Sequence, residues 1–293
     1  MKKFKFLSKL LAVLVIVPAI ILCTACGGGQ LAQQAKLEKK EFTQLNSVAE
    51  FQTKMDEITD KEIVNGYHMS FEAKMNMMGF ADFEKFNMNM YYVPGETVET
   101  TKLAAKYDVK MNMDMEIPGM DPIESTAEME GTMYVKDGYS YSAIKGSATA
   151  NGETENIDEK TKAPFGLGEG MDFASMATDF ADLESLLAQF QFEDMLDVEG
   201  VSFFVSTDGT QLKMVVDAFE EEGLKVSKYE MIFQFAEGKL TGFAIEAVME
   251  VGVGDEVMPM EMKITVAPFE GEIDMPETFE GYTEETEEPG LGF

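Results

Sequence analysis

The sequence has no arginine and no tryptophan, and it contains one histidine and two cysteines. Both cysteines, Cys23 and Cys26, lie near the amino terminus, so the rest of the chain can form no disulfide, no Cys/His zinc site and no cysteine nucleophile. The single histidine, His68, would have to serve any Ser–His–Asp triad alone, and no G-x-S-x-G motif accompanies it. We therefore expect no catalysis, no metal and no cofactor, and we expect His68 to be an exposed strand residue.

Positive charge is scarce as well. The chain has 54 acidic residues against 23 basic ones, all of them lysines, and its formal net charge is −31. Nucleic-acid binding depends on basic side chains that neutralise phosphates, so we expect no nucleic-acid partner. The acidic surface also repels anionic lipid headgroups, so attachment to a membrane would have to come from an apolar anchor.

The apolar run Leu10–Leu22 is shorter than the roughly 20 residues that span a bilayer, and it follows a lysine-rich start. Thr24, Ala25 and Cys26 come next, and three glycines follow them. This arrangement resembles a bacterial lipoprotein signal peptide, in which signal peptidase II cuts before a cysteine that carries a diacylglyceryl thioether. The resemblance implies a signal peptide over residues 1–25, lipid attachment at Cys26 and an extracytoplasmic protein anchored to the bacterial cell membrane. An ordinary signal peptide cut elsewhere and an uncleaved anchor are the alternatives.

Strict alternation of apolar and polar residues recurs along the chain and predicts strands with one buried and one wet face. Turn sequences such as Lys136-Asp137-Gly138 separate several of these segments, so consecutive strands should pair as antiparallel hairpins. We expect Glu72, Asn112, Glu130 and Glu261 on the wet faces. The alternating segments are 67–77, 86–92, 109–117, 127–135, 139–144, 201–206, 211–216, 229–235, 243–251 and 258–266.

Two segments have helical periodicity: part of Gln30–Asp60, and Asp172–Leu196. We expect a loop over Gly146–Gly170. The sequence thus predicts an α+β protein that is mainly antiparallel β, with a curved half-barrel sheet of about ten strands closed by an N-terminal and a mid-chain helix. Two helices cannot cover a sheet whose strands are about 4.8 Å apart, so the sheet should curl or enclose a cavity. The expected organisation is a signal peptide at 1–25, a lipidated linker or stalk at 26–43, a half-barrel β domain at 44–270 and an acidic tail at 271–293.

The chain is rich in methionine, with 24 residues that fall mostly on the apolar phase of the strands. Methionine is flexible and polarizable and suits surfaces that repack around varied apolar ligands, so these residues could line a hydrophobic cavity. A filled core in which methionine replaces leucine and isoleucine is the alternative, and a copper(I) site of thioethers is a third interpretation. The candidate cavity residues are Met69, Phe71, Met75, Met77, Met88, Met90, Met111, Met113, Met115, Met129, Met249, Met260 and Met262.

Two short phrases add a family resemblance: Gly131–Tyr141 (GTMYVKDGYSY) and Ile273–Phe279 (IDMPETF). The signal peptide that ends at Cys26 and the two runs of strands separated by a helix belong to the same pattern. Together these features resemble the LolA-like lipoprotein-carrier superfamily, including surface lipoproteins of Gram-positive bacteria, over about residues 40–280. The resemblance implies a curved half-barrel whose hydrophobic cavity holds acyl chains. We therefore expect a membrane-anchored lipoprotein that binds or carries a lipid-like ligand. A structural or interaction lipoprotein with a filled core is the alternative.

Overall fold

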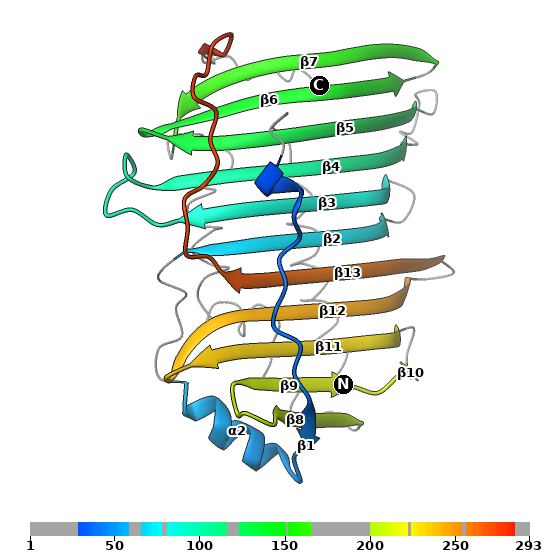
Figure 1. Cartoon of the computed structure of the whole chain (residues 1–293). Helices are drawn as coiled ribbons and strands as arrows, with labels where there is room; N and C mark the ends of the chain where they lie inside the picture. Colours follow the sequence, from blue (N-terminus) through cyan, green and yellow to red (C-terminus); the bar gives the residue numbers. More distant parts are fainter. Residues whose placement is uncertain are drawn as a thin grey trace.

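The computed structural model describes residues 29–58, 66–77, 81–115, 123–150, 152–165, 200–221, 224–253 and 256–284. These residues form one open, curved sheet of fourteen strands (Figure 1). The described residues also contain one 3₁₀ helix, η1 (Gly29–Ala32), and one α-helix, α2 (Val48–Asp56). Neither of these helices combines the length and the apolar character that crossing a membrane would require.

Nine of the fourteen strands have 11 to 15 residues, and the other five have two to six. Their bounds are β1 (Phe42–Gln44), β2 (Tyr67–Met77), β3 (Ala81–Val93), β4 (Lys102–Met115), β5 (Ile123–Lys136), β6 (Tyr139–Ala150), β7 (Glu153–Pro164), β8 (Val201–Ser206), β9 (Gln211–Val216), β10 (Phe219–Glu221), β11 (Leu224–Ala236), β12 (Lys239–Val253), β13 (Glu256–Pro268) and β14 (Thr283–Glu284).

Two antiparallel meanders, β2–β7 and β8–β13, join side by side into the single sheet. The last strand of the second meander, β13, pairs with the first strand of the first meander, β2, and Ile264 lies opposite Phe71. The order across the sheet is β1-β8-β9-β11-β12-β13-β2-β3-β4-β5-β6-β7-β14, and β10 pairs with β11 off this path. The short strand β1 therefore covers one edge of the sheet, and β14, which is parallel to β7, covers part of the other.

The predicted alternation of faces is confirmed. On β2, Tyr67, Met69 and Phe71 are buried in the main core, whereas Glu130 on β5 and Glu261 on β13 are exposed. Glu72 and Asn112 are half-buried. We call the face that carries the main core the inner face and the opposite face the outer face.

The predicted hairpin turns are also present, and their backbone explains the residues used. Asp137 and Gly138 between β5 and β6 have φ of 53° and 78°, and Glu237 and Gly238 between β11 and β12 have φ of 54° and 75°. Two successive residues with positive φ produce the turn twist that matches paired strands, and glycine adopts it without steric cost.

The sheet has more strands than the predicted ten or so, because β1, β7, β10 and β14 carry no alternation signal. The strand β7 lies within the segment predicted as a loop, at Gly146–Gly170. Most of its side chains are exposed, and it is held by a continuous register with β6. Backbone pairing, rather than side-chain burial, therefore forms this strand, and periodicity in the sequence cannot detect it.

The predicted N-terminal helix is present but short. Ser47 caps α2 by accepting a hydrogen bond from the Glu50 N–H at 3.3 Å, and the Glu50 carboxylate accepts one from the Asn46 N–H at 2.8 Å. The helix buries Phe51 against Phe203, with 4.7 Å between ring centroids. It packs on β8 and β9, so it covers a corner of the inner face. The predicted mid-chain helix, Asp172–Leu196, lies outside the described residues.

Two extended segments cross the outer face of the sheet (Figure 1). The N-terminal strap, residues 29–41, passes over the strands from β4 towards β8, and the C-terminal strap, residues 269–284, passes from β13 to β7. The segments assigned from sequence to a linker and to a tail therefore lie on the sheet where they are described, at 29–43 and 271–284. A second apolar cluster holds the straps down, and its buried members are Leu31, Tyr91, Ala104, Tyr134 and Ile273.

Candidate ligand-binding surfaces

The candidate cavity residues whose side chains are described lie together on the inner face. They come from six strands that are neighbours in the sheet, in the order β12, β13, β2, β3, β4 and β5. One cross-strand row contains Met249, Met260, Met75, Phe83 and Met111. Because side chains in such a row stand about 5 Å apart, their thioethers form a nearly continuous methionine surface. We call this surface the methionine face.

Most of the methionine face is closely packed. Met69 and Met90 are 1% exposed, and Met249 is 2% exposed. Phe71, Met75, Met129, Met260 and Met262 are buried as well. The predicted residues that remain half-buried are Met88, Met111 and Met113, on β3 and β4. The side chains of Met77 and Met115 lie outside the described part of the structure.

The same face contains methionines that the list of candidate residues omitted. Met133, Met214, Met231 and Met258 are buried in the main core, and the alternation of their strands would have placed them there. The Tyr229 hydroxyl donates a hydrogen bond to the Met231 sulfur at 3.4 Å. Burial raises the pKa of Tyr229, so this phenol stays neutral and contributes a polar group that is satisfied inside the core.

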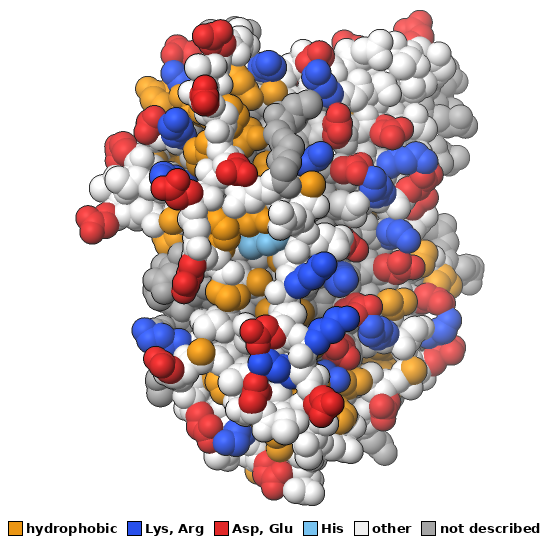
Figure 2. Space-filling view, in the orientation of Figure 1, with side chains coloured by type: hydrophobic (Ala, Val, Ile, Leu, Met, Phe, Trp, Pro, Cys, Tyr) orange, Lys and Arg blue, Asp and Glu red, His pale blue; other side chains and the backbone are white. Residues whose placement is uncertain are grey.

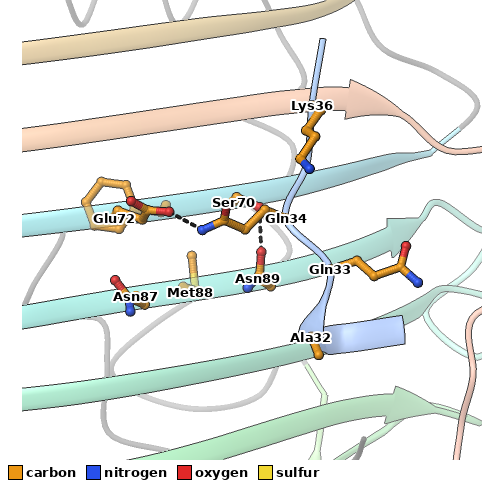
Figure 3. Close-up of a pocket in the computed structure, with 10 residues that line it drawn as sticks. Ala32, Gln33, Gln34, Lys36, Ser70, Glu72, Asn87, Met88 and Asn89 are labelled. Atoms are coloured by element: carbon orange, nitrogen blue, oxygen red, sulfur yellow. Dashed lines mark hydrogen bonds between the residues drawn. The ribbon is translucent and has the colours of Figure 1, made fainter. Parts of the chain in front are cut away.

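A polar pocket of about 510 Å³ lies on the outer face, between the N-terminal strap and strands β2 and β3 (Figure 3). Its lining includes Gln33, Gln34 and Lys36 from the strap, and Ser70, Glu72, Asn87 and Asn89 from the strands. Gln34 donates a hydrogen bond to the Glu72 carboxylate, and Ser70 Oγ donates to Asn89 Oδ1 at 2.5 Å. The Ala35 N–H in turn donates to Ser70 Oγ at 2.6 Å, which ties the strap to the floor of the pocket.

The expected exposure of His68 is wrong. Its side chain is on the outer face as predicted, but it is only 9% exposed, because Tyr91 stacks on it and the backbone of the N-terminal strap contacts it at Gln33. The imidazole stacks on Tyr91 with ring centroids 4.0 Å apart, and the Gln33 backbone hydrogen-bonds to it. Burial lowers the pKa of His68 to about 4, and the Gln33 contact opposes this shift only in part. Alternation along one strand cannot reveal that a distant segment covers its polar face.

The outer face also carries an aromatic cluster that the sequence prediction missed. The rings of Tyr141 and Phe279 stack at 3.9 Å between centroids, and Tyr282 meets both of them edge-on at 5.7 Å. Tyr141 and Phe279 pack against the second apolar cluster. The available signal was the presence of tyrosines on the polar phase of the strands, as at Tyr91 and Tyr141.

The acidic residues of the described ranges form no cluster of three or more groups that could hold a metal ion. Many of them instead form cross-strand ion pairs with lysines on the sheet surface. Lys228 contacts Glu246 at 2.5 Å, and Lys225 contacts Glu250 at 2.5 Å. Exposed pairs of this kind contribute little to stability individually. They place lysines beside carboxylates of the acidic surface.

Comparison with known proteins gives structural likeness only. No known family and no curated protein matches the sequence. One similar solved structure is a beta-barrel-like protein of a domain of unknown function from Brucella abortus, with 11% identity and a TM-score of 0.23 over 69% of this chain and 98% of that one. Another is an S-type phycobiliprotein lyase from Guillardia theta, with 7% identity and a TM-score of 0.20 over 77% of this chain and 94% of that one. Neither match assigns a family or a ligand to this chain.

Proposed function

We propose that this protein is a bacterial lipoprotein, anchored outside the cytoplasm through acylated Cys26, whose methionine face binds a hydrophobic, lipid-like ligand without catalysing a reaction. The observation that carries the proposal is the concentration of methionine on six neighbouring strands of one face. The LolA-like carriers, which the sequence resembles, bind acyl chains on the corresponding surface, and membership of that superfamily is part of the proposal.

The area and the flexibility of the methionine face both favour ligand binding. Six strands spaced about 4.8 Å apart, with about 3.3 Å per residue, present an apolar surface several times larger than α2, the one α-helix among the described residues, can cover by itself. Unbranched thioether side chains can change rotamer at low cost, so a surface built from them can open and close around acyl chains of different shape. The half-buried Met111 and Met113 on β4 are where we place the entry of such a ligand.

The free energy of burying acyl chains explains how such an anchor would hold the protein at a membrane. Each buried methylene contributes about 0.8 kcal/mol, so a diacylglyceryl group with a further acyl chain anchors a protein stably where a single chain does not. Such an anchor is needed here because the net negative charge opposes attraction to anionic headgroups.

The second candidate is a structural or interaction lipoprotein with a filled core. The low exposure of Met69, Met90 and Met249 favours it, because side chains that line an open cavity retain accessible surface. The two candidates differ in what a polar side chain on the methionine face would disturb. In a carrier it disturbs ligand uptake, and in a filled core it mainly disturbs stability.

The test compares Met113→Gln and Met260→Gln with the matched controls Met113→Leu and Met260→Leu. Uptake of a fluorescent fatty acid and the thermal midpoint are measured for all four variants. A carrier loses uptake in the Gln variants with a small change in midpoint and keeps it in the Leu variants. An unsatisfied polar group in a filled core costs about 1–3 kcal/mol, so Gln variants that melt several degrees lower, together with wild-type protein that takes up no probe, would refute the carrier function.

A further inference from the structure

The proposed anchor is separated from the folded domain by very little chain. Only Gly27 and Gly28 lie between Cys26 and Gly29, where η1 begins. An extended residue spans at most about 3.6 Å, so Cys26 lies within roughly 11 Å of Gly29. A lipid on Cys26 therefore holds the surface around η1 close to the membrane for as long as η1 stays on the sheet.

The contacts of η1 keep it on the sheet. Leu31 is 2% exposed within the second apolar cluster. Gln30 joins three partners: its carbonyl accepts from the Tyr91 hydroxyl at 3.1 Å, its Oε1 accepts from the Asp274 N–H at 2.8 Å, and its Nε2 donates to the Glu272 carbonyl at 3.2 Å. Gln30 thus fastens both straps to β3, so the described part of the chain nearest to Cys26 is docked on the sheet.

A patch of aromatic and lysine side chains lies on the same face as η1, on β5, β6, β7 and the C-terminal strap. We define the aromatic patch as Tyr139, Tyr141, Phe279 and Tyr282 with Lys136, Lys160 and Lys162. Lys162 Nζ is 4.0 Å from the centroid of Tyr139, Lys160 Nζ is 5.6 Å from Tyr282, and Lys136 Nζ is 5.9 Å from Phe279. Tyr139 is 38% exposed, and the other three rings are half-buried.

The patch is continuous with the cluster that holds the anchor end of the chain. Tyr141 and Phe279 pack against the cluster that contains Leu31. Figure 2 shows hydrophobic side chains gathered on the outer face over one end of β4, β5 and β6, beside the C-terminal strap. The short tether and the apolar patch therefore lie on one side of the molecule.

We infer that this side of the protein is its membrane-contacting surface, and that the aromatic patch inserts into the interfacial layer of the bilayer to which Cys26 is anchored. The inference rests on the proposed lipidation of Cys26. Tyrosine rings are amphipathic and favour the headgroup level, and lysines extend their apolar stems along such a surface while the ammonium group reaches water. The methionine face, which lies on the other side of the sheet, then points away from this bilayer.

The charge near the patch determines which lipid headgroups this surface binds most strongly. The C-terminal strap exposes Glu277 and Glu280 close to the patch, and these carboxylates oppose anionic headgroups. The contact should therefore be strongest on phosphatidylcholine, whose headgroup is neutral overall, and should weaken when phosphatidylglycerol is added at low salt.

The test uses the absence of any cysteine after Cys26, which allows one engineered thiol to be labelled selectively. An environment-sensitive fluorophore is placed at Tyr139→Cys in the patch or at Val257→Cys on β13, which is 60% exposed at the far end of the same face and serves as a control for distance from the patch. The strand register places these sites five strands, or about 24 Å, apart across the sheet, and roughly 40 Å apart along the strands. Each lipidated protein is reconstituted into phosphatidylcholine vesicles that contain nitroxide-labelled lipid.

We expect quenching of the label at position 139 and none at position 257, with both proteins floating with the vesicles. Floating protein whose two labels are equally quenched, or both unquenched, overturns the inference while the anchor stands. Protein that carries no acyl chains by intact mass and does not float overturns the anchor and, with it, the inference. Circular dichroism of the two variants confirms that each labelled protein is folded.

Discussion

At the scale of single residues, the imidazole of His68 is a titratable group whose surroundings disfavour its charged form. It is stacked on Tyr91, and its Nε2 atom is buried and has no hydrogen-bond partner among the described residues. A proton at Nε2 would therefore be unsatisfied, which agrees with the lowering of the His68 pKa to about 4 by burial.

Between about pH 6.5 and pH 4, the unfolded chain binds a proton at His68 that the folded chain does not. The contribution of His68 to the free energy of unfolding should therefore be highest above pH 6.5 and should fall by about 2–3 kcal/mol as the pH drops to 4. His68→Phe keeps a ring over Tyr91 and removes the titration. Urea unfolding of both proteins at several pH values measures the difference.

Carboxylate titrations affect both proteins and cancel in this comparison. The stability of wild type relative to His68→Phe should decline from pH 7 to pH 4. A constant difference over that range would mean that the strap accommodates the imidazolium and that His68 is not buried in solution as described here.

At the scale of elements, the strands differ in what forms them. The central strands β2, β3, β12 and β13 bury one face in the main core, whereas β7 is held by backbone pairing at an edge. Edge strands expose unpaired backbone groups and invite pairing with other chains. The acidic side chains of β7, with Glu153, Glu155 and Glu159 among them, and the short parallel strand β14 protect this edge.

Close backbone approach gives a prediction for the pairing of β4 and β5. Gly131 lies opposite Tyr107, and a Cβ at position 131 would overlap the Tyr107 ring. Because Tyr107 is buried, Gly131→Ala should destabilise the protein by about 1–3 kcal/mol through overpacking. Denaturant unfolding of wild type and Gly131→Ala measures this loss of stability.

The control for this prediction is the pair Tyr107→Ala and Tyr107→Ala/Gly131→Ala. Once the ring is gone, the alanine at position 131 fills freed space, so the double variant should be more stable than the sum of the two single effects predicts. Strict additivity would show that the strain at residue 131 arises from the backbone and not from the ring.

At the scale of the whole molecule, the two ends of the described chain complete the sheet. Strand β1 pairs with β8 at one edge and β14 with β7 at the other, while the straps cross the outer face between them. Lys40 of the N-terminal strap contacts Asp208 at 2.8 Å in the β8–β9 turn, and this ion pair is the main reason that the pKa of Asp208 is held well below its usual range. The straps thus connect both meanders.

Anchoring is a property of the whole molecule, and Cys26→Ser tests it. The variant cannot carry a thioether lipid, so we expect it to be released from membranes or to remain unprocessed. Membrane fractionation and detergent-phase partitioning of cells that express wild type or Cys26→Ser provide the measurement. A variant that enters the detergent phase at wild-type size would show that Cys26 is not the anchor; Cys23→Ser is the matched control and should behave as wild type.

The sequence alone determined the strands whose two faces differ in environment. Alternation placed Met69, Phe71 and Met260 correctly in the core, because the side-chain period of a strand is two and a shift of one residue would expose them. It also determined the hairpin turn at Asp137-Gly138, where aspartate and glycine tolerate positive φ. These features depend on neighbours in the chain or on burial of one face, and both leave a local pattern.

Only the tertiary structure decided the features that depend on distant segments. The N-terminal strap buries His68 and forms the polar pocket over β2 and β3, and no local pattern at residues 29–41 signals that crossing. The pairing of β13 with β2 and the edge strand β7 likewise depend on backbone groups, which every residue carries. Side-chain periodicity reports which face a residue occupies, but it does not report which segment lies above that face.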